Sequence, residues 1–548
     1  MGFLRKLSSE RYLKFGVTPA KKGSSSVLWL CLLLAIFSQA PARGFSQTAS
    51  DAQAHADRGI QLAQAGNLAD AEVELRRAVE RAPNNPAYLT DLGTILAMQK
   101  KLEESTGCFT KALKLDPDNL TTRRYLAANL WQLHRPQDAR HNLELVLKVA
   151  PDDRSSILLL GMVSENLKDY ATAAKLLASV PDLVQQQPES VAALARSYYH
   201  MNETAKARQT LDSLLHEPVD GRGVFLGGRI AAEVRDFDTA ARLYKAIRST
   251  YPDRAALGYN LALAQYDGQH FGDAQQTLLD LVGAGYQTGE IYNLLGWCYE
   301  KQNRTKEALQ AFEDTISREP SKEQNYLDLG KASYAAGLFT DALGAAKRAL
   351  AVHPESHDAY LLEGDSEYRL SQFTDAIASY SRAAQFDHAD PEADLGIARA
   401  QSAAGMTEAA RTSFEDGIKR FPKHARHHLD YGLMLLGLAE AGDDAAGNQA
   451  TAQLKMALAL DSHLSEADYR LGSLALEAGR LSEALNYLRA ADRLDPDKSK
   501  THFALARAYR RLGRQDDEAQ QMALFQKLKN QEDHKLAPAP SAAGMDHD

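Results

Sequence analysis

Three histidines and an aspartate lie close together in the C-terminal third of the chain, at His424, His427, His428 and Asp430. Imidazole nitrogens and carboxylate oxygens serve as metal ligands and as general acids or bases, and residues four apart share a helix face. However, Pro422 precedes the cluster, so we expect His424 in a turn and not on the helix. We therefore predict no metal site and no catalytic residues here, and rank an enzyme that uses this cluster last.

The other reactive residue types give no site either. Cys108 and Cys298 lack the paired spacing of a zinc site or a redox motif, so we interpret both as packed thiols. The glycines near Gly221 and Gly330 do not have the spacing of a phosphate-binding loop, and no nucleophilic serine motif occurs. The sequence predicts a protein that is not an enzyme and has no cofactor.

The composition indicates a folded protein and excludes some partners. Of 548 residues, 44% are hydrophobic and 25% are charged, which is typical of globular chains. The net charge of -9 has the wrong sign for coating nucleic acid or an anionic membrane surface. The length alone suggests three or four globular domains, unless the chain is a repeat.

The N-terminal segment is typical of an export signal. Residues 1–26 are basic and lead into the apolar run 27–37, which is too short to span a bilayer comfortably. The small residues at 40–42 favour cleavage after Ala42, so we predict a signal peptide over 1–42. An uncleaved membrane anchor at residues 27–40 and a buried helix are the alternatives. A signal or an anchor would place the bulk of the chain in the bacterial periplasm or outside the cell.

A small residue recurs every 34 positions from position 59 onward. The series loses one residue before Gly228 and gains six before Gly472, and we call its members the small-residue marks. They are Gly59, Gly93, Ala127, Gly161, Ala195, Gly228, Ala262, Gly296, Gly330, Gly364, Ala398, Gly432, Gly472 and Ala506. In almost every unit a second small residue follows the mark by twelve positions, and in eight units a Pro follows it by 24.

This period predicts a stack of antiparallel helical hairpins. Two helices approach closely where the facing side chains are small, so we expect each mark to face the small residue twelve positions later. The Pro then ends the hairpin, because it cannot continue a helix. One hairpin buries little apolar surface, so stacking must supply a continuous core. One repeat array therefore replaces the three or four domains suggested by length.

One unit shows most plainly which family the repeat resembles. Its motif is Tyr292-Asn293-Leu294-Leu295-Gly296-Trp297-Cys298-Tyr299, followed by Ala308, Phe312 and Pro320. This pattern resembles the tetratricopeptide repeat, and about fourteen units cover residues 52–531 after a linker at 43–51. The resemblance implies an all-α fold, a right-handed superhelical solenoid of antiparallel helical hairpins. It also implies a scaffold that binds other proteins in its concave groove.

Departures from the period predict irregular parts. Pro181 comes four residues early, and the unit that starts from Ala262 lacks its final Pro, so we expect irregular structure at 181–288 between two regular stacks. The six inserted residues, with turn signals such as Gly442, predict a loop insertion at 439–448. Residues 532–548 are predicted to form a disordered tail.

The resemblance places the residue just after each mark, and the one four before it, on the concave side of the groove. The candidates for partner binding are Arg229, Tyr259, Tyr266, Trp297, Lys331, Tyr334, Asp365, Tyr368 and Arg399. Aromatic residues and Arg are typical interface anchors, although such tyrosines can also pack within the repeat. Chaperone-binding family members hold a carboxylate with Asn and Lys or Arg, but here the matching places carry no Asn. Only Asn260 matches the Asn ladder of the protein-glycosylating transferase.

We therefore expect an exported, non-enzymatic scaffold that mediates protein–protein interactions through its groove. Its partners would be proteins or peptides, not nucleic acid, and it would touch a membrane only through an uncleaved anchor. The alternative is a cell-envelope assembly or export factor for surface polysaccharide, pili or outer-membrane components. No pore or catalytic domain accompanies the repeats, so in that case the partner would have to supply it.

Overall fold

The computed structural model describes residues 47–216 and 218–536. The predicted signal peptide, part of the linker and most of the predicted tail lie outside these residues. The chain divides into two compact bodies, and the division falls between Asn303 and Arg304. Each body is described by itself below, as the N-terminal body and the C-terminal body.

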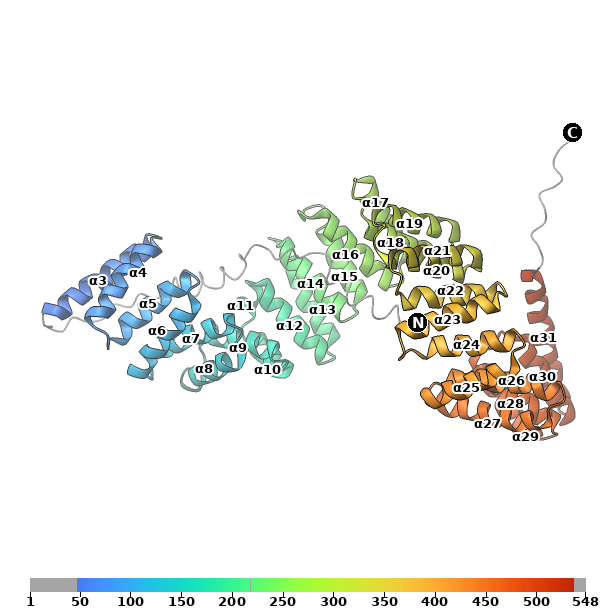
Figure 1. Cartoon of the computed structure of the whole chain (residues 1–548). Coiled ribbons are helices and arrows are strands. Elements are labelled where there is room, and N and C mark those ends of the chain that lie inside the picture. The colour runs from blue at the N-terminus through green and yellow to red at the C-terminus, as the bar shows by residue number, and fades with distance from the viewer. Residues whose placement is uncertain (1–46, 217, 537–548) are drawn as a thin grey trace. The chain divides into compact units, whose positions relative to one another are not determined.

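The N-terminal body consists of helices, most of which pair in chain order into antiparallel hairpins (Figure 1). They are α3 (Gln47–Gln64), α4 (Leu68–Arg81), α5 (Pro86–Met98), α6 (Leu102–Leu115), α7 (Leu120–Gln132), α8 (Pro136–Val149), α9 (Arg154–Asn166), α10 (Tyr170–Ala178), α11 (Pro181–Gln185), α12 (Pro188–His200), α13 (Thr204–Asp212), the short 3-10 helix η1 (Ser213–Leu215), α14 (Gly221–Glu233), α15 (Phe237–Ala246), α16 (Arg254–Asp267), α17 (Phe271–Gly283) and α18 (Gly289–Lys301).

The C-terminal body continues with the same alternation of helices. They are α19 (Thr305–Arg318), α20 (Glu323–Ala335), α21 (Phe339–Val352), α22 (His357–Arg369), α23 (Phe373–Phe386), α24 (Pro391–Ala403), α25 (Thr407–Arg420), α26 (Ala425–Glu440), α27 (Asp444–Leu460), α28 (Ser465–Glu477), α29 (Leu481–Leu494), α30 (Ser499–Arg511) and α31 (Gln515–Leu536).

The turn that follows the first helix of each hairpin contains a residue with positive φ, which turns the chain back. This residue follows the mark by seven positions in every turn except that of Gly442. In the N-terminal body most of these turns use a side-chain-bearing residue, whereas glycine predominates in the C-terminal body. The non-glycine residues are Lys100, His134, Lys168, Asn202, Arg235, Gln269 and Asn303 in the first body and Ser371 in the second.

The small-residue marks permit close packing within each hairpin, but their nearest neighbour differs from the one expected. A Cβ atom added to Gly228 would lie 2.5 Å from the ring of Tyr244, sixteen residues later on the second helix. The residue twelve positions after a mark approaches through its backbone, as Ala71 does at Gly59. Each glycine mark of this kind therefore makes room for a large side chain and not for an alanine methyl group.

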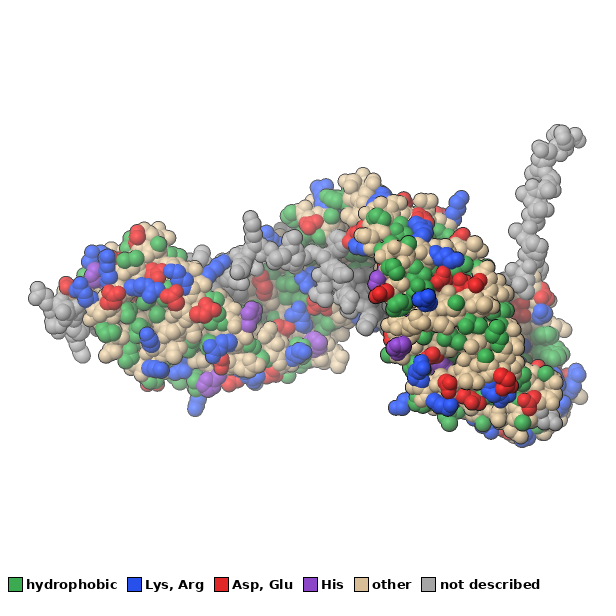
Figure 2. All heavy atoms as spheres, viewed as in Figure 1, with side chains coloured by type: hydrophobic (Ala, Val, Ile, Leu, Met, Phe, Trp, Pro, Cys, Tyr) green, Lys and Arg blue, Asp and Glu red, His purple; other side chains and the backbone are tan. Residues whose placement is uncertain are grey.

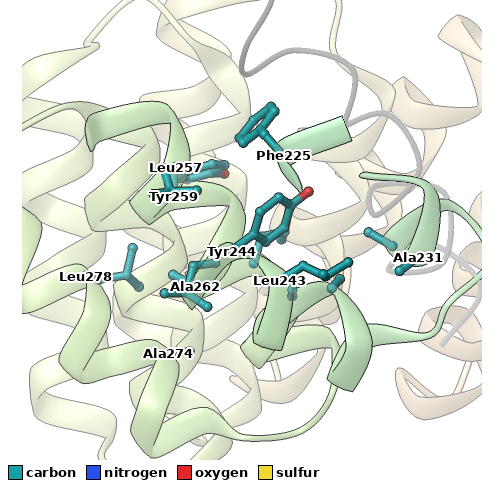
Figure 3. Packing of buried hydrophobic residues seen from close by; sticks show 14 of the residues in the cluster. Phe225, Ala231, Leu243, Tyr244, Leu257, Tyr259, Ala262, Ala274 and Leu278 are labelled. Carbon is teal, nitrogen blue, oxygen red and sulfur yellow. The ribbon is translucent and has the colours of Figure 1, made fainter. Parts of the chain in front are cut away.

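Tyr244 shows how this arrangement builds the core of the N-terminal body (Figure 3). Its side chain is fully buried, and its ring lies 5.4 Å from the ring of Phe225 on α14. Leu257 and Tyr259 on α16, from the next hairpin, belong to the same hydrophobic cluster. The core therefore runs from one hairpin into its neighbour, as expected for a repeat stack.

The six inserted residues lengthen two helices and do not form a loop. Helix α26 has 16 residues and α27 has 17, whereas α28 has 13 and α29 has 14. The turn between them is only Ala441, Gly442 and Asp443, and Asp443 caps α27 by accepting hydrogen bonds from the backbone of residues 445 and 446. The predicted loop insertion at 439–448 is wrong, because the inserted small residues continue the helical pairing.

The irregular helices lie close to the early proline, whereas residues 221–283 of the predicted irregular region form the paired helices α14 to α17. Helix α10 has nine residues and is followed by the five-residue α11, which begins at Pro181. The division between the two bodies, however, falls at Asn303 and not within residues 181–288. At the C-terminal end, α31 continues to Leu536, so residues 532–536 are helical and the predicted tail began too early.

The all-α fold is confirmed, since the described residues form an array of helical hairpins and contain no strand. Among residues 47–216 and 218–536, no helix combines the length and the apolar character needed to cross a bilayer.

Candidate protein-binding face

The first helices of the hairpins lie on the inner side of each stack. In the C-terminal body α20 contacts α22, α22 contacts α24, and α24 contacts α26, whereas no two successive second helices pack as closely. In a curved row of hairpins, the helices that approach their equivalents most closely lie on the concave side. We call the solvent-facing surface of the first helices α20, α22, α24, α26, α28 and α30 the inner face of the C-terminal body. The corresponding first helices of the N-terminal body form its own inner face.

Two of the nine predicted partner-binding residues are buried. Tyr259 is 5% exposed and belongs to the hydrophobic cluster of α14–α18, and Trp297 on α18 is 8% exposed. These aromatic side chains occupy the core of the stack, with little surface left for a partner. Tyr259 precedes its mark by three residues and Trp297 follows its mark by one, and the sequence alone did not show that these positions face the core.

Three predicted tyrosines pack against the helix that follows them. The rings of Tyr266, Tyr334 and Tyr368 meet those of Phe271, Phe339 and Phe373 edge to face, with centroids 5.3 to 5.6 Å apart. Each tyrosine follows its mark by four residues, and each phenylalanine begins the second helix of the same hairpin. The three tyrosines therefore brace the hairpin turns, and each remains partly exposed.

Three predicted cations have carboxylate neighbours. Arg229 lies 3.7 Å from Glu233, and Lys331 lies 3.9 Å from Asp358 on the next first helix. Arg399 on α24 forms a close ion pair with Asp430 on α26, which is only 14% exposed. Burial raises the pKa of Asp430, and the charge of Arg399 opposes this shift. The pair links two successive first helices.

Asp365 is the remaining predicted residue and differs from the other eight. It lies on α22 directly after Gly364, and its Oδ1 accepts a 2.7 Å hydrogen bond from the hydroxyl of Tyr380 on α23. Its side chain is exposed to solvent, yet the surrounding protein raises the pKa of the carboxyl group by desolvation. Such a combination is expected in a concave surface, where a group faces water but is surrounded by protein on its other sides.

Other charged residues of the inner faces were missed by sequence reasoning. In the N-terminal body Arg196 lies 2.7 Å from Glu165 and 3.6 Å from Glu233, so one cation bridges three hairpins. In the C-terminal body Glu466 lies 2.8 Å from Arg470 and 2.6 Å from Lys500. Arg196 directly follows the mark Ala195, so applying the same positional rule to every unit would have found it.

The histidine cluster brings two imidazole rings into contact. The Nδ1 atoms of His424 and His427 are 2.7 Å apart, so the N–H of one ring donates a hydrogen bond to the other ring. His427 is fully buried, and burial together with the charge of His424 lowers its pKa to about 4. His428 turns instead to Gln453, with Nδ1 2.7 Å from Oε1. Within the described residues, no three His, Cys, Asp or Glu side chains converge as metal ligands.

The outer surface is mixed in charge. On the side of the molecule drawn in Figure 2, Lys and Arg side chains are interspersed with Asp and Glu in both bodies. Ion pairs between neighbouring hairpins account for part of this pattern, for example Arg348 with Glu313 at 2.6 Å and Arg242 with Asp212 at 2.6 Å. Exposed pairs of this kind contribute little free energy each, about 0 to 1 kcal/mol.

The stacked hairpins and their inner faces define a repeat scaffold of the kind that mediates protein–protein interactions. The tetratricopeptide repeat family model matches residues 56–119, 126–188, 259–322, 327–394, 395–462 and 469–532, and a second model of the same repeat matches 193–217. The chain belongs to the tetratricopeptide repeat family.

Several known proteins are similar over part of the chain. The type IV pilus assembly protein PilF of Pseudomonas aeruginosa is 27% identical over 205 residues, which cover 36% of this chain and 80% of that protein. The N-alpha-acetyltransferase 16 NatA auxiliary subunit of Mus musculus is 25% identical over 229 residues, 34% of this chain and 26% of that protein. This match therefore spans about a quarter of the mouse protein. The crystal structure of yeast Tom70 aligns with 89% of this chain and 97% of its own at 16% identity, with a TM-score of 0.40.

Proposed function

We propose that this protein is an exported, non-enzymatic scaffold that holds other proteins on the inner faces of its two bodies. The observation that carries the proposal is the inner face of the C-terminal body, where charged and aromatic side chains from successive hairpins are exposed side by side. Partner contact remains a prediction for the seven residues of the set that are at least partly exposed, which are Arg229, Tyr266, Lys331, Tyr334, Asp365, Tyr368 and Arg399. Tyr259 and Trp297 are better interpreted as core residues.

Site-specific photocrosslinking in the native host tests the proposal. A photoreactive phenylalanine replaces Tyr368 on α22, and the matched control replaces the exposed Ala378 on α23, a second helix of the same hairpin. We expect a discrete crosslinked protein with the probe at position 368 and a weaker or absent band with the probe at 378. Equal crosslinking at both positions would contradict binding on the inner face.

Export rests on the basic and apolar pattern of residues 1–42, which lie outside the described residues. The expected mature protein begins at Arg43 and is found outside the cytoplasm. Cell fractionation followed by mass spectrometry of the intact N-terminus measures both properties. Cytoplasmic protein with Met1 retained would contradict the proposal, whereas envelope-bound protein with an intact N-terminus would favour the membrane anchor.

A role in cell-envelope assembly is the second candidate. It is favoured by the similarity to the type IV pilus assembly protein of Pseudomonas aeruginosa, which covers 80% of that protein. Under this proposal the partner captured at position 368 is an envelope component, such as a pilus, polysaccharide-export or outer-membrane protein. Deletion of the gene should then reduce surface pili, polysaccharide or an outer-membrane component, and a mutant with all of these intact would contradict it.

A further inference from the structure

The exposed carboxylate of Asp365 has no ion-pair partner among the described residues. Its Oδ1 is held at 2.7 Å by the Tyr380 hydroxyl, which is neutral. Tyr380 reaches this position because its ring passes between two first helices at Gly364 and Gly396, where an added Cβ would lie 2.8 Å and 2.6 Å from the ring. The core of the body therefore orients the carboxylate rigidly while leaving it accessible.

Two cations on α22 and on the next first helix have other contacts. Arg399 on the next first helix is paired with Asp430. Arg369 on the same helix places its guanidinium over the rings of Phe339 and Tyr334, at 4.2 Å and 5.7 Å from their centroids. The charge of Arg399 still attracts the Asp365 carboxylate at longer range, and the charge of Glu392 on α24 opposes this effect. Asp365 is therefore left without an ion-pair contact among the described residues, and its charge is compensated only in part.

An aromatic ring accompanies this charge. Tyr368 follows Asp365 by three residues on α22, so both side chains lie on the same face of the helix. The ring is partly exposed while its packing against Phe373 holds it in place. A carboxylate beside an aromatic ring suits Lys and Arg, because their charged ends pair with the acid and their aliphatic stems cover the ring.

We propose that Asp365 and Tyr368 form a subsite for a Lys or Arg side chain of an extended protein segment that lies along α22 and α24. The inference rests on the proposed function and adds the chemistry of the bound partner. Charge complementarity selects this occupant: the carboxylate is exposed, partly desolvated, and bonded only to a neutral hydroxyl. A Lys or Arg side chain of the partner would pair with the Asp365 carboxylate, which has no ion-pair contact among the described residues.

Peptide selection on the purified full chain tests the subsite. A library of random linear twelve-residue peptides displayed on phage is selected against the wild-type protein, the Asp365→Asn variant and the Asp365→Lys variant. Asp375→Asn on α23 is the control, because Asp375 is an exposed acid on the second helix of the same hairpin. Circular dichroism melting shows whether each variant is folded.

We expect Lys or Arg to be enriched at one peptide position on the wild type and on Asp375→Asn. The enrichment should vanish on Asp365→Asn and change to Asp or Glu on Asp365→Lys. Fluorescence anisotropy with the best selected peptide should show affinity about tenfold weaker for Asp365→Asn. The same peptide with its cation replaced by Gln should bind the wild type and Asp365→Asn equally.

The outcomes separate this inference from the proposed function. Peptides that bind without a basic preference, or with affinity unchanged by Asp365→Asn, would overturn the subsite and leave the scaffold proposal standing. If no peptide is selected although the probe at position 368 still captures a partner, the inference of an extended segment is wrong. Failure of both experiments would overturn the inference together with the proposed function. Dimerisation that buries Tyr368, detected by sedimentation, would assign this face to a second copy and also overturn it.

Discussion

The imidazole of His357 and the carboxylate of Asp390 lie 2.9 Å apart and connect two neighbouring hairpins of the C-terminal body. The other ring nitrogen, Nδ1, is 2.9 Å from the backbone carbonyl oxygen of Ala383. Since both neighbours are acceptors, both nitrogens must carry a proton, and His357 is a cation in this arrangement. Burial alone would lower its pKa, but the hydrogen bonds to Ala383 and Asp390 outweigh burial and raise it.

This raised pKa predicts that His357 stabilises the protein in a pH-dependent way. The folded state holds the proton more tightly than the unfolded state, so the contribution is complete below the unfolded pKa of about 6.5. It is lost as the pH rises through the folded pKa. We expect His357→Leu to lower the free energy of unfolding by about 1–2 kcal/mol at pH 6, and by less at pH 9. Urea unfolding at both pH values measures this, and equal losses would contradict it.

The lowered pKa of His427 predicts the opposite dependence of stability on pH from that of His357. Its pKa is lowered to about 4, so on acidification the unfolded state takes up the proton before the folded state does. Stability should fall by up to about 3 kcal/mol as the pH drops from about 6.5 to 4. His427→Gln should reduce this acid sensitivity, whereas His463→Gln should not, because His463 is 80% exposed. Unfolding curves at several pH values test this, and identical slopes for the wild type and His427→Gln would refute it.

Because the ring of Tyr380 lies against Gly364 and Gly396, we expect substitution of either glycine by a larger residue to destabilise the protein. Gly364→Ala or Gly396→Ala would push a methyl group into the ring, and we expect a loss of about 1–3 kcal/mol. Gly344 lies within helix α21 with open space around its Cβ position, so Gly344→Ala should instead stabilise by about 0.5–1 kcal/mol. Thermal melting compares the three variants. A Gly364→Ala protein as stable as the wild type would show that α23 can move away.

Arg399 and Asp430 should be energetically coupled. Removing Arg399 leaves the mostly buried Asp430 carboxylate without its cation, which costs more than removing both charges. A double-mutant cycle with Arg399→Met and Asp430→Asn should therefore give a coupling energy of about 1–2 kcal/mol by urea unfolding. If the single losses simply add, the pair contributes nothing to the contact between α24 and α26.

Replacement of the turn residue Lys168 by glycine should stabilise the protein. Its φ of 63° lies in the left-handed region, which disfavours residues with a Cβ atom. Lys168→Gly should raise the free energy of unfolding by up to about 1 kcal/mol, whereas Lys175→Gly within helix α10 should lower it by about 1 kcal/mol. Melting temperatures of the two variants check the signs. Destabilisation by Lys168→Gly would mean that its side chain makes a contact worth more than the strain.

The fold followed from the sequence because its signal is local and repeated. Each mark such as Gly93 must admit a large side chain such as Phe109, and this requirement recurs every 34 residues. The turn residues were not predictable in the same way. Lys168 and Arg235 adopt positive φ although nothing in their residue type favours it, because the helices on both sides force the turn.

The candidate site was harder to predict, because the sequence does not show which positions of a first helix face the core. Tyr259, three residues before its mark, is buried, whereas Tyr368, four residues after its mark, is partly exposed. The contacts of Arg399 depend on Asp430, which belongs to another unit 31 residues later. Such pairings arise from the packing of neighbouring hairpins, so they become visible only when the hairpins are placed beside one another.

The lengthened hairpin of α26 and α27 shows where such a chain can gain residues during evolution. The extra residues lie at the tip, where Ala439 faces Gly447, and both helices grow by the same amount. Growth at the free tip leaves the packing positions of Gly432 and Leu454 in register with the adjacent hairpins. Insertions of equal length into both helices at the tip therefore leave the packing between hairpins unchanged. A hairpin can acquire a protruding tip while the residues of its neighbours stay the same.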